Sequence, residues 1–404
     1  MTLTISDLKG KSKEEIAKLL SLKDDLPPAK EAALSKLAAL GLPSKKSEEY
    51  RYFDVEKLLD RSYELHLHLP KEPKIGEKII IENGIIVEAP KGMRVYYDQC
   101  DALDLEHFDP MYYLGHLLSP HVIKIDLDGD AEVELVHRYT HSGVLLPYRI
   151  VLFNQANRHA TVYETFEAGE ISESLVLYGY DIHIAPDSTL RVIKTQSMTD
   201  NRYAMIASHR IKADKRANAV LKSFDLGGDQ ALQLIKVDLE SYAHVDAGHL
   251  LYLNHASKRG TVSKIIHKGE HATSQQEAKN ILDGDARGIF DALIKVEHSA
   301  KWTKAHQNSK AILLHENAYM AAKPQLEIYI DELEASHGAT TGQLDLKQLF
   351  YLQSRGISYV EARKMLVIAF ANTLIETVKD TRHQERIKNA FEEAFYQAHS
   401  RDKG

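Results

Sequence analysis

The pattern of apolar and polar positions divides the chain into three parts. Residues 1–76 show helical spacing, residues 77–331 show short apolar runs with polar breaks, and residues 332–404 return to helical spacing. Most runs in the middle part are too short for helices and alternate apolar with polar residues, which is typical of half-buried strands. No helices alternate regularly with these strands, which disfavours a doubly wound α/β fold. We expect a mainly β body between two helical domains. The sequence shows no clear repeat, so its periodicity leaves a sandwich, a large barrel and a parallel β-helix all open.

Local end signals place several elements. A helix is expected after Ser12, which is an N-cap candidate with Glu15 at the capping-box position. A second helix should begin near Pro28 and end before Gly41. In the β body, Asn83-Gly84 separates two β-branched runs and predicts a hairpin.

The segment 324–357 has the most distinctive pattern in the chain. Its first residues alternate apolar with polar side chains as far as Asp331, which predicts a strand. A polar loop is expected around Ser336-His337-Gly338, followed by a helix with Asp345 as N-cap and Gly356 just past its end. A neutral imidazole binds metals and carries protons near pH 7. The residues alone leave two interpretations of His337: a surface histidine bonded to its own loop, or a metal ligand or proton carrier.

Two more helices are expected at the C-terminus. The first starts with a capping box formed by Ser358 and Glu361, and the second spans residues 381–398. The expected apolar face of the first consists of Ala362, Met365, Leu366, Ala369, Phe370, Thr373 and Leu374. Such a stripe seals the end of the β body, or offers surface to another chain, and it can do both.

Composition and charge narrow the class of protein. With 51 Lys and Arg against 58 Asp and Glu, the net charge is −7, which argues against nucleic acid as the main partner. No apolar run approaches a membrane span, and the first thirty residues lack a signal-peptide core, so we expect a cytoplasmic protein without a membrane partner.

The chain contains a single cysteine, Cys100. One cysteine rules out a disulfide framework and a zinc site built from several thiolates. It also rules out a conventional iron–sulfur cluster held by this chain alone, because such a cluster takes about four thiolate ligands. Cys100 lies between two aspartates, which raise the pKa of a thiol and reduce its reactivity.

Histidines are plentiful, and the densest group lies in the β body. His244, Asp246, His249 and His255 follow one another closely, and on a strand His244 and Asp246 share a face. Two imidazoles and one carboxylate form the facial triad that binds iron. The alternative function is therefore a metal-dependent enzyme on this β body, a sandwich, barrel or β-helix, using His244, Asp246 and His255. The default is exposed strand histidines, because the spacing matches no closed ligand motif.

Residues 323–358, KPQLEIYIDELEASHGATTGQLDLKQLFYLQSRGIS, resemble the C-terminal signature of the SufB/SufD family of iron–sulfur cluster assembly proteins, and Glu361-Ala362-Arg363 follows at the expected place. Residues 41–55, GLPSKKSEEYRYFDV, resemble the N-terminal segment of the family. Further similar residues in the central region are His244-Val245-Asp246, His255, Ser274, Lys279, residues 286–296, Lys301-Trp302-Thr303 and Gln307. The resemblance covers nearly the whole chain.

Within the family, the site residues are similar to the SufD branch. Ser336-His337-Gly338 has the SufD form, and Leu352 stands where SufB has a cysteine proposed as a cluster ligand. Ala335 departs from the pattern, because this position is often a cysteine in SufD relatives. If the segment touches iron or sulfide, His337 must do so without a neighbouring thiol.

The resemblance implies a right-handed parallel β-helix flanked by helical domains, with boundaries at 1–76, 77–331 and 332–404. It implies a non-enzymatic scaffold that pairs with a SufB-like subunit and contacts a SufC-like ATPase through its C-terminal domain. The expected contact residues are Phe350, Tyr351, Arg355, Gly356, Met365 and Phe370.

His337 would serve as a cluster or iron ligand shared with the SufB-like partner. We expect no cofactor bound by the isolated chain and a transient iron–sulfur cluster in the complex, and the sequence leaves flavin binding open. A homodimer that uses the same surface is a further possibility when the partner is absent.

Overall fold

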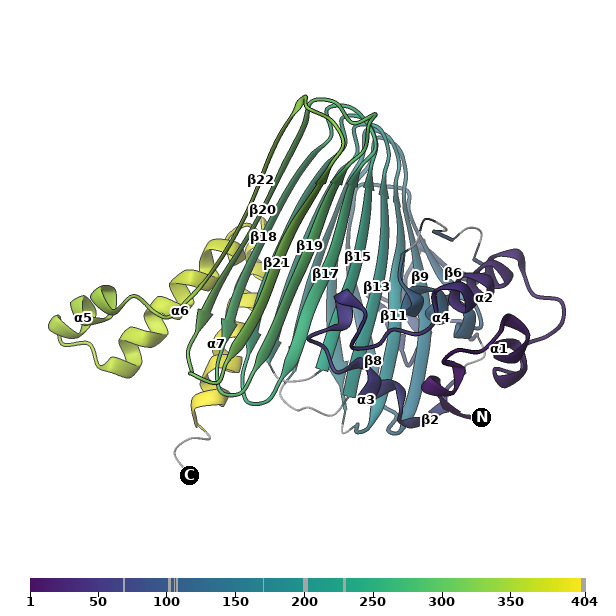
Figure 1. The fold of residues 1–404 in the computed structure, drawn as a ribbon, viewed down its shortest axis with the longest axis horizontal. Coiled ribbons are helices and arrows are strands. Elements are labelled where there is room, and N and C mark those ends of the chain that lie inside the picture. Colours follow the sequence, from purple (N-terminus) through teal and green to yellow (C-terminus); the bar gives the residue numbers. More distant parts are fainter. Residues whose placement is uncertain are drawn as a thin grey trace.

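The computed structural model describes the chain except residues 68–69, 101–102, 105, 107, 170, 199–202, 228–229 and 401–404. Two eleven-stranded sheets form its body (Figure 1). Sheet A contains β1 (Thr2–Thr4), β2 (Ser62–Leu65), β6 (Arg94–Asp98), β7 (Val122–Leu127), β9 (Val144–Asn154), β11 (Ser174–Ile184), β13 (Tyr203–Ala213), β15 (Gln230–Leu239), β17 (Lys258–His267), β19 (Arg287–Val296) and β21 (Tyr319–Ile328). Sheet B contains β3 (Lys74–Gly76), β4 (Ile79–Glu82), β5 (Ile85–Pro90), β8 (Ala131–Tyr139), β10 (His159–Ala168), β12 (Thr189–Met198), β14 (Asn218–Gly227), β16 (His244–Leu253), β18 (Thr273–Leu282), β20 (Thr303–Leu313) and β22 (Leu333–Gly342).

From β8 onward the chain alternates between the two sheets, and each strand pairs in parallel with the strand two places later. This topology is a parallel β-solenoid, as the resemblance implied. The repeat length varies between neighbouring coils, from 26 residues (Leu221 to Ala247) to 32 residues (Arg287 to Tyr319). The varying length explains why the sequence shows no crisp repeat.

Apart from α5, which projects away from the sheets, the helices lie on the outer faces of the two sheets. They are α1 (Lys13–Leu19), α2 (Pro28–Leu40), α3 (Val55–Leu59), α4 (Pro110–Leu118), α5 (Leu346–Ser354), α6 (Tyr359–Ile375) and α7 (Thr381–Ser400), with short 3₁₀ turns η1 (Ile5–Leu8) and η2 (Glu48–Tyr50). The N-terminal helices and α4 pack on sheet A, whereas α6 and α7 pack on sheet B. None of the described helices is long and apolar enough to span a membrane.

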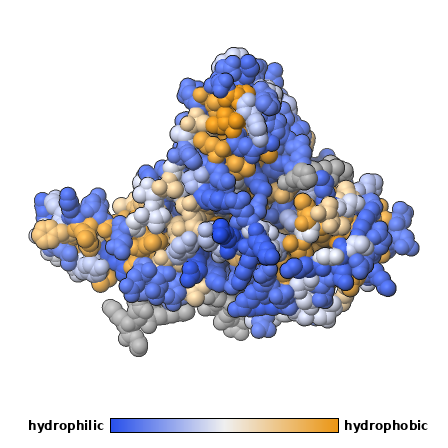
Figure 2. Space-filling view, in the orientation of Figure 1, coloured by the Kyte–Doolittle hydropathy of each residue, from blue (hydrophilic) through white to orange (hydrophobic). Residues whose placement is uncertain are grey.

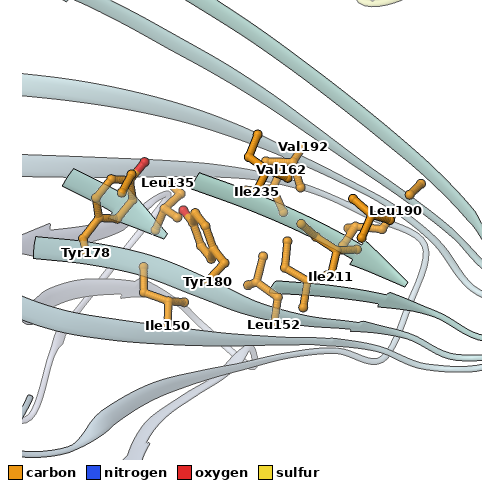
Figure 3. Packing of buried hydrophobic residues seen from close by; sticks show 14 of the residues in the cluster. Leu135, Ile150, Leu152, Val162, Tyr178, Tyr180, Leu190, Val192, Ile211 and Ile235 are labelled. Carbon is orange, nitrogen blue, oxygen red and sulfur yellow. The ribbon is translucent and has the colours of Figure 1, made fainter. Parts of the chain in front are cut away.

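The main hydrophobic core lies inside the solenoid. Figure 3 shows part of it, where Val162 and Val192 of sheet B face Ile211 and Ile235 of sheet A. Alternate residues of each strand point inward, so β-branched side chains stack from coil to coil and remove their apolar surface from water.

Several local predictions are confirmed. Ser12 and Glu15 form the capping box of α1, and Gly41 ends α2 with φ +71°. Asn83-Gly84 joins β4 and β5 in an antiparallel hairpin, with both residues at positive φ. Asp345 caps α5 by accepting a hydrogen bond from the backbone N–H of Lys347.

Two local predictions are wrong. The loop expected around Ser336-His337-Gly338 is the strand β22, so the β body extends to Gly342 and the C-terminal helices begin later than residue 332. The predicted β region also contains the helix α4, which begins at an Asp109 N-cap followed by Pro110. α4 is buried on every side, so its apolar run lacks helical alternation with polar residues.

The buried face predicted for α6 is only partly correct. Ala362 and Leu374 are buried, but Met365 is 43% exposed, and Val367 and Ala371 are buried in its place. α6 is apolar on most sides, so its spacing fits more than one face.

Candidate functional site

The solenoid ends in an uncovered coil formed by β21 and β22. Among the described strands, β21 pairs only with β19 and β22 pairs only with β20, so each leaves one edge unpaired. Leu326 and Leu333 pack against the inner core but stay partly exposed. Figure 2 shows an apolar patch near the top of the solenoid, over its last strands. α5 projects away from this coil rather than closing it (Figure 1).

His337 lies at the end of an inward-facing row of side chains on sheet B. The strand register aligns Val133, Val162, Val192, Leu221, Ala247, Gln276, Gln307 and His337 from coil to coil. The row is apolar through Ala247 and polar in the last three coils. Gln307 is 2% exposed and donates hydrogen bonds from Nε2 to the carbonyl oxygens of Gln325 and Ala292.

One hydrogen bond sets the chemistry available at His337. Its Nδ1 lies 3.0 Å from the carbonyl oxygen of Pro324, on β21. A carbonyl oxygen only accepts, so Nδ1 carries the proton and donates. Nε2 then keeps its lone pair, and no described residue occupies it. An imidazole whose other nitrogen is held by a carbonyl is the usual arrangement of a metal ligand.

The neighbours of His337 lie on the two faces of β22. Ala335 lies on the same side of the strand and packs partly into the core, so it offers no ligand atom. Ser336 faces the other way, where its hydroxyl lies 2.8 Å from Nδ1 of His306 on β20. His337 is therefore the one residue of this triplet that presents a donor atom inside the open coil.

A second exposed surface lies on α5 and the start of α6. We call it the α5–α6 patch, and it consists of Leu346, Phe350, Tyr351, Tyr359, Val360 and Met365. Leu346 and Phe350 are 74% and 72% exposed. Figure 2 shows the apolar surface over α5. A contiguous group of large exposed apolar residues marks an interaction site more often than a scattered one does.

The sequence prediction named only half of the α5–α6 patch. The expected contact residues include Phe350, Tyr351 and Met365 of this patch but not Leu346, Tyr359 and Val360. The exposure of the α5 residues depends on how that helix packs, since it buries only Leu349, and this packing is a property of the fold rather than of the local sequence.

The remaining predicted contact residues have structural roles in this chain. Arg355 donates from Nη2 to the hydroxyl of Tyr351, and Gly356 takes the positive φ of +84° that ends α5. Phe370 packs toward the solenoid, beneath the ammonium group of Lys279 at 4.5 Å from the ring centroid.

The metal triad proposed from sequence does not form. His244 and Asp246 lie at the start of β16, whereas His255 follows its other end, about 30 Å along the strand. Asp246 is bound by the ammonium of Lys222 at 2.8 Å, and Nδ1 of His244 lies 2.6 Å from the hydroxyl of Thr273. Among the described residues, no group of three His, Cys, Asp or Glu side chains is placed to hold a metal ion.

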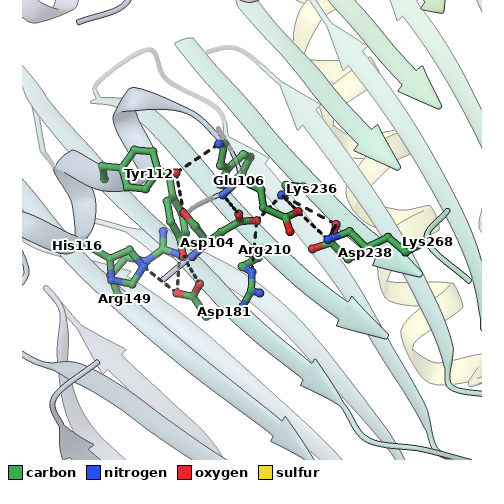
Figure 4. A network of polar contacts seen from close by, with 12 residues as sticks. Asp104, Glu106, Tyr112, His116, Arg149, Asp181, Arg210, Lys236, Asp238 and Lys268 are labelled. Carbon is green, nitrogen blue, oxygen red and sulfur yellow. Dashed lines mark hydrogen bonds and ion pairs between the residues drawn. The ribbon is translucent and has the colours of Figure 1, made fainter. Parts of the chain in front are cut away.

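A group of buried ion pairs lies away from the open coil. Under α4, His116 and Arg149 contact Asp181 at 2.9 Å each (Figure 4). Burial opposes the charge of Asp181, but Arg149 and His116 outweigh it and hold its pKa well below the usual range. In the same figure, Lys236 contacts Asp104 at 2.6 Å. These pairs fasten α4 and the preceding segment to sheet A.

Comparisons with known proteins match two family models. The model described as "SufBD protein N-terminal region" matches residues 12–78, and the model described as "SUF system FeS cluster assembly, SufBD core domain" matches residues 137–370.

Curated relatives carry the SufD name. The iron–sulfur cluster assembly protein SufD of Escherichia coli K12 is 39% identical over 116 residues, 29% of this chain and 27% of the relative. SufD of Bacillus subtilis is 35% identical over 108 residues, 27% of this chain and 25% of the relative. SufD of Plasmodium falciparum is 23% identical over 260 residues, 63% of this chain and 18% of the relative. Each alignment thus covers about a quarter of the relative's length or less.

Proposed function

The chain belongs to the SufB/SufD family of iron–sulfur cluster assembly proteins, on its SufD side, and from this we propose that it is a non-enzymatic scaffold subunit of a SufBCD-type complex. In this proposal the open coil meets a SufB-like subunit, His337 contributes to a nascent cluster at that interface, and the α5–α6 patch docks a SufC-like ATPase.

The observation that carries the proposal is the position of His337. It lies at the uncovered end of the solenoid, with Nδ1 bonded to Pro324 and Nε2 directed by that bond to accept a metal or a proton. The unpaired edges of β21 and β22 support a partner at this place, because exposed edges with apolar surface between them favour pairing with another chain.

The single cysteine supports a shared site rather than a self-contained one. Cys100 belongs to the segment before α4, on the sheet A side, far along the chain from β22. A cluster takes about four thiolate ligands, so the partner must supply the sulfur ligands while this chain supplies imidazole. The cluster is cargo in this scheme, assembled at the interface and passed on.

The α5–α6 patch supports the docking of a second protein. Its aromatic members resemble the residues that dominate binding energy at protein interfaces. It lies on α5, which projects away from the solenoid, and on the start of α6, so a partner bound there would be held apart from the open coil. The metal-dependent enzyme is not favoured, since His244, Asp246 and His255 do not converge.

The first experiment tests His337. The chain is co-expressed with SufB-like and SufC-like subunits, and the iron and sulfide content of the purified complex is measured for His337→Ala and for His306→Ala. His306 is the matched control, because it is a neighbouring histidine on the outer face. We expect a loss of about tenfold or more for His337→Ala alone. An unchanged cluster yield in that variant would remove the ligand role.

The second experiment tests the docking surface with point substitutions. Deleting the C-terminal helices would expose the core beneath α6 and α7, so Phe350→Ala and Leu346→Ala are preferable. Tyr396→Ala on α7 is the control, since Tyr396 is 51% exposed but lies outside the patch. Pull-down of the SufC-like ATPase should weaken by about tenfold or more for the patch variants. Equal recovery in all three variants would locate the ATPase elsewhere.

The third measurement addresses the isolated chain. A homodimer through the open coil should dissociate in a β22 variant that places a charge on its apolar surface, such as Leu333→Glu. Mass measurement in solution compares this variant with the parent chain, and a dimer that survives the change uses another surface.

A further inference from the structure

A cleft lies between the outer face of sheet B and the turn that joins α6 to α7. Its volume is about 600 Å³, within the usual range for small-molecule sites. The sheet B strands β8, β10, β12, β14 and β16 supply its floor, and residues 377–380 supply one wall. His244 and Asp246 line it, so two of the residues that the sequence singled out do meet at a site, though not as a metal triad.

The acidic groups of this cleft are already paired with cations of the chain. Asp246 accepts from Lys222 at 2.8 Å. Asp380 contacts His383 at 2.9 Å and Arg382 at 3.2 Å. Arg382 also approaches Glu132, at 3.8 Å. These contacts reduce the negative charge that the carboxylates would otherwise present to an anion.

Two cationic groups of the cleft are left over. Arg191, on β12, and Lys379, in the α6–α7 turn, both line the cleft, and neither forms an ion pair with any described residue. Both cations are therefore available to a ligand, Arg191 from the floor of the cleft and Lys379 from the wall formed by residues 377–380. A planar guanidinium together with an ammonium group is suited to a phosphate group.

Two hydroxyl groups add to these cations. Tyr163 is 6% exposed, and its ring stacks on His383 with centroids 3.4 Å apart at 7°. Burial, with Glu132 and Asp380 nearby, raises the pKa of Tyr163 to about 12, so its hydroxyl keeps a proton to donate. Thr161 is 9% exposed on the same strand. Both side chains line the cleft.

We propose that this cleft binds a small organic phosphate. Arg191 and Lys379 hold the phosphate oxygens, the hydroxyls of Tyr163 and Thr161 donate to them, and the organic part rests on Ile193, Val220 and Val378. The site is independent of the scaffold role. A bound ligand joins the solenoid to the α6–α7 turn, so it stiffens the helical unit that carries the α5–α6 patch.

The test is isothermal titration of the full-length chain with three probes: adenosine monophosphate, glucose 6-phosphate and inorganic phosphate. We expect at least one organic phosphate to bind with a dissociation constant below about 1 mM. Arg191→Ala and Lys379→Ala should each weaken binding by about tenfold or more. Arg386→Ala is the control, because Arg386 is a cation of α7 that pairs with Glu134 and does not line the cleft.

The pattern across the probes identifies the ligand class. If only the nucleotide binds, the apolar floor recognises a base. If both organic phosphates bind, the cleft accepts phosphate monoesters whatever their organic part. Absence of binding by both organic probes, or affinities unchanged in Arg191→Ala and Lys379→Ala, would overturn the proposal. Since the titration uses the chain alone, either result leaves the tests of His337 and the α5–α6 patch unaffected.

Discussion

Asp225 is the centre of a buried ionic cluster inside the solenoid, and its removal should be costly. Oδ1 accepts from Nζ of Lys194 at 2.8 Å and from Nη2 of Arg259 at 2.7 Å. Oδ2 accepts from the hydroxyl of Ser223 at 2.6 Å and from Nε2 of Gln233 at 2.7 Å. All five side chains are buried, so water cannot replace the lost partner.

The substitution Asp225→Asn keeps the shape of the side chain and removes its charge. Two cations then remain in the interior without their counter-ion, and breaking a buried pair in this way costs about 3–5 kcal/mol of unfolding free energy. Burial raises the pKa of a carboxyl, but Lys194 and Arg259 outweigh burial and hold the pKa of Asp225 well below its usual range.

The sign of the pH dependence follows from that lowered pKa. A carboxyl with a depressed folded-state pKa contributes stability above its unfolded pKa of about 3.9 and loses it as the pH falls through the folded value. The cost of Asp225→Asn should therefore be complete at about pH 7 and shrink below about pH 4.

Urea denaturation of the parent chain and the variant measures this cost at both pH values. Asp187→Asn is the control, since Asp187 forms an exposed pair with Arg216, and such pairs contribute about 0–1 kcal/mol. A cost below about 1 kcal/mol for Asp225→Asn, or a cost that does not change with pH, would refute the reasoning.

Three further predictions concern local stability. Phe391 is fully buried against Tyr252, so Phe391→Ala should lower the unfolding free energy by about 3–5 kcal/mol, and equal hydrogen exchange in α7 before and after the change would contradict this. Burial raises the pKa of Asp109 to about 6, so its charged form is disfavoured in the folded state and stability falls as the pH rises from about 4 to about 6; Asp109→Asn should flatten that fall in urea titrations, and an unchanged slope would count against it. Ser358 accepts from the N–H of Glu361, so Ser358→Ala should cost about 1 kcal/mol, seen as faster exchange in the first turn of α6 and nowhere else.

Helix ends were predictable from the sequence because they depend on a few neighbouring residues. Ser12, Asp345 and Ser358 each cap the helix expected of them, since a side-chain oxygen satisfies a backbone N–H two or three positions later whatever the rest of the fold does. The β body was predictable for the same reason, because alternation is a local signal.

The pairing of the strands was not predictable from periodicity, because neighbouring coils differ in length. β22 was missed for a physical reason: it lies at an uncovered edge, so both of its faces carry exposed residues, such as Ser336 on one face and Thr341 on the other, and it shows no apolar alternation. The resemblance to the family singled out His337 as a site candidate, but only the register shows that it continues the row of Gln276 and Gln307.

The cleft that Arg191 lines could not be predicted from local sequence patterns. Its residues come from five strands and an interhelical turn, and their pairing states depend on which side chains meet in space. The sequence placed His244 and Asp246 together and suggested a metal. Only the structure shows that the Asp246 carboxylate forms an ion pair with Lys222.

The two ends of the solenoid are unlike, and this difference limits how copies can add to one another. At the C-terminal end the parallel ladder stops at β21 and β22, whereas at the other end it gives way to the antiparallel pairs β4–β5 and β6–β7. A second molecule placed behind the first would therefore meet a different strand arrangement, which disfavours head-to-tail growth into a filament. Two terminal coils that meet face to face cover the unpaired edges of β21 and β22 in both copies, and the pair then presents only its two far ends to further molecules.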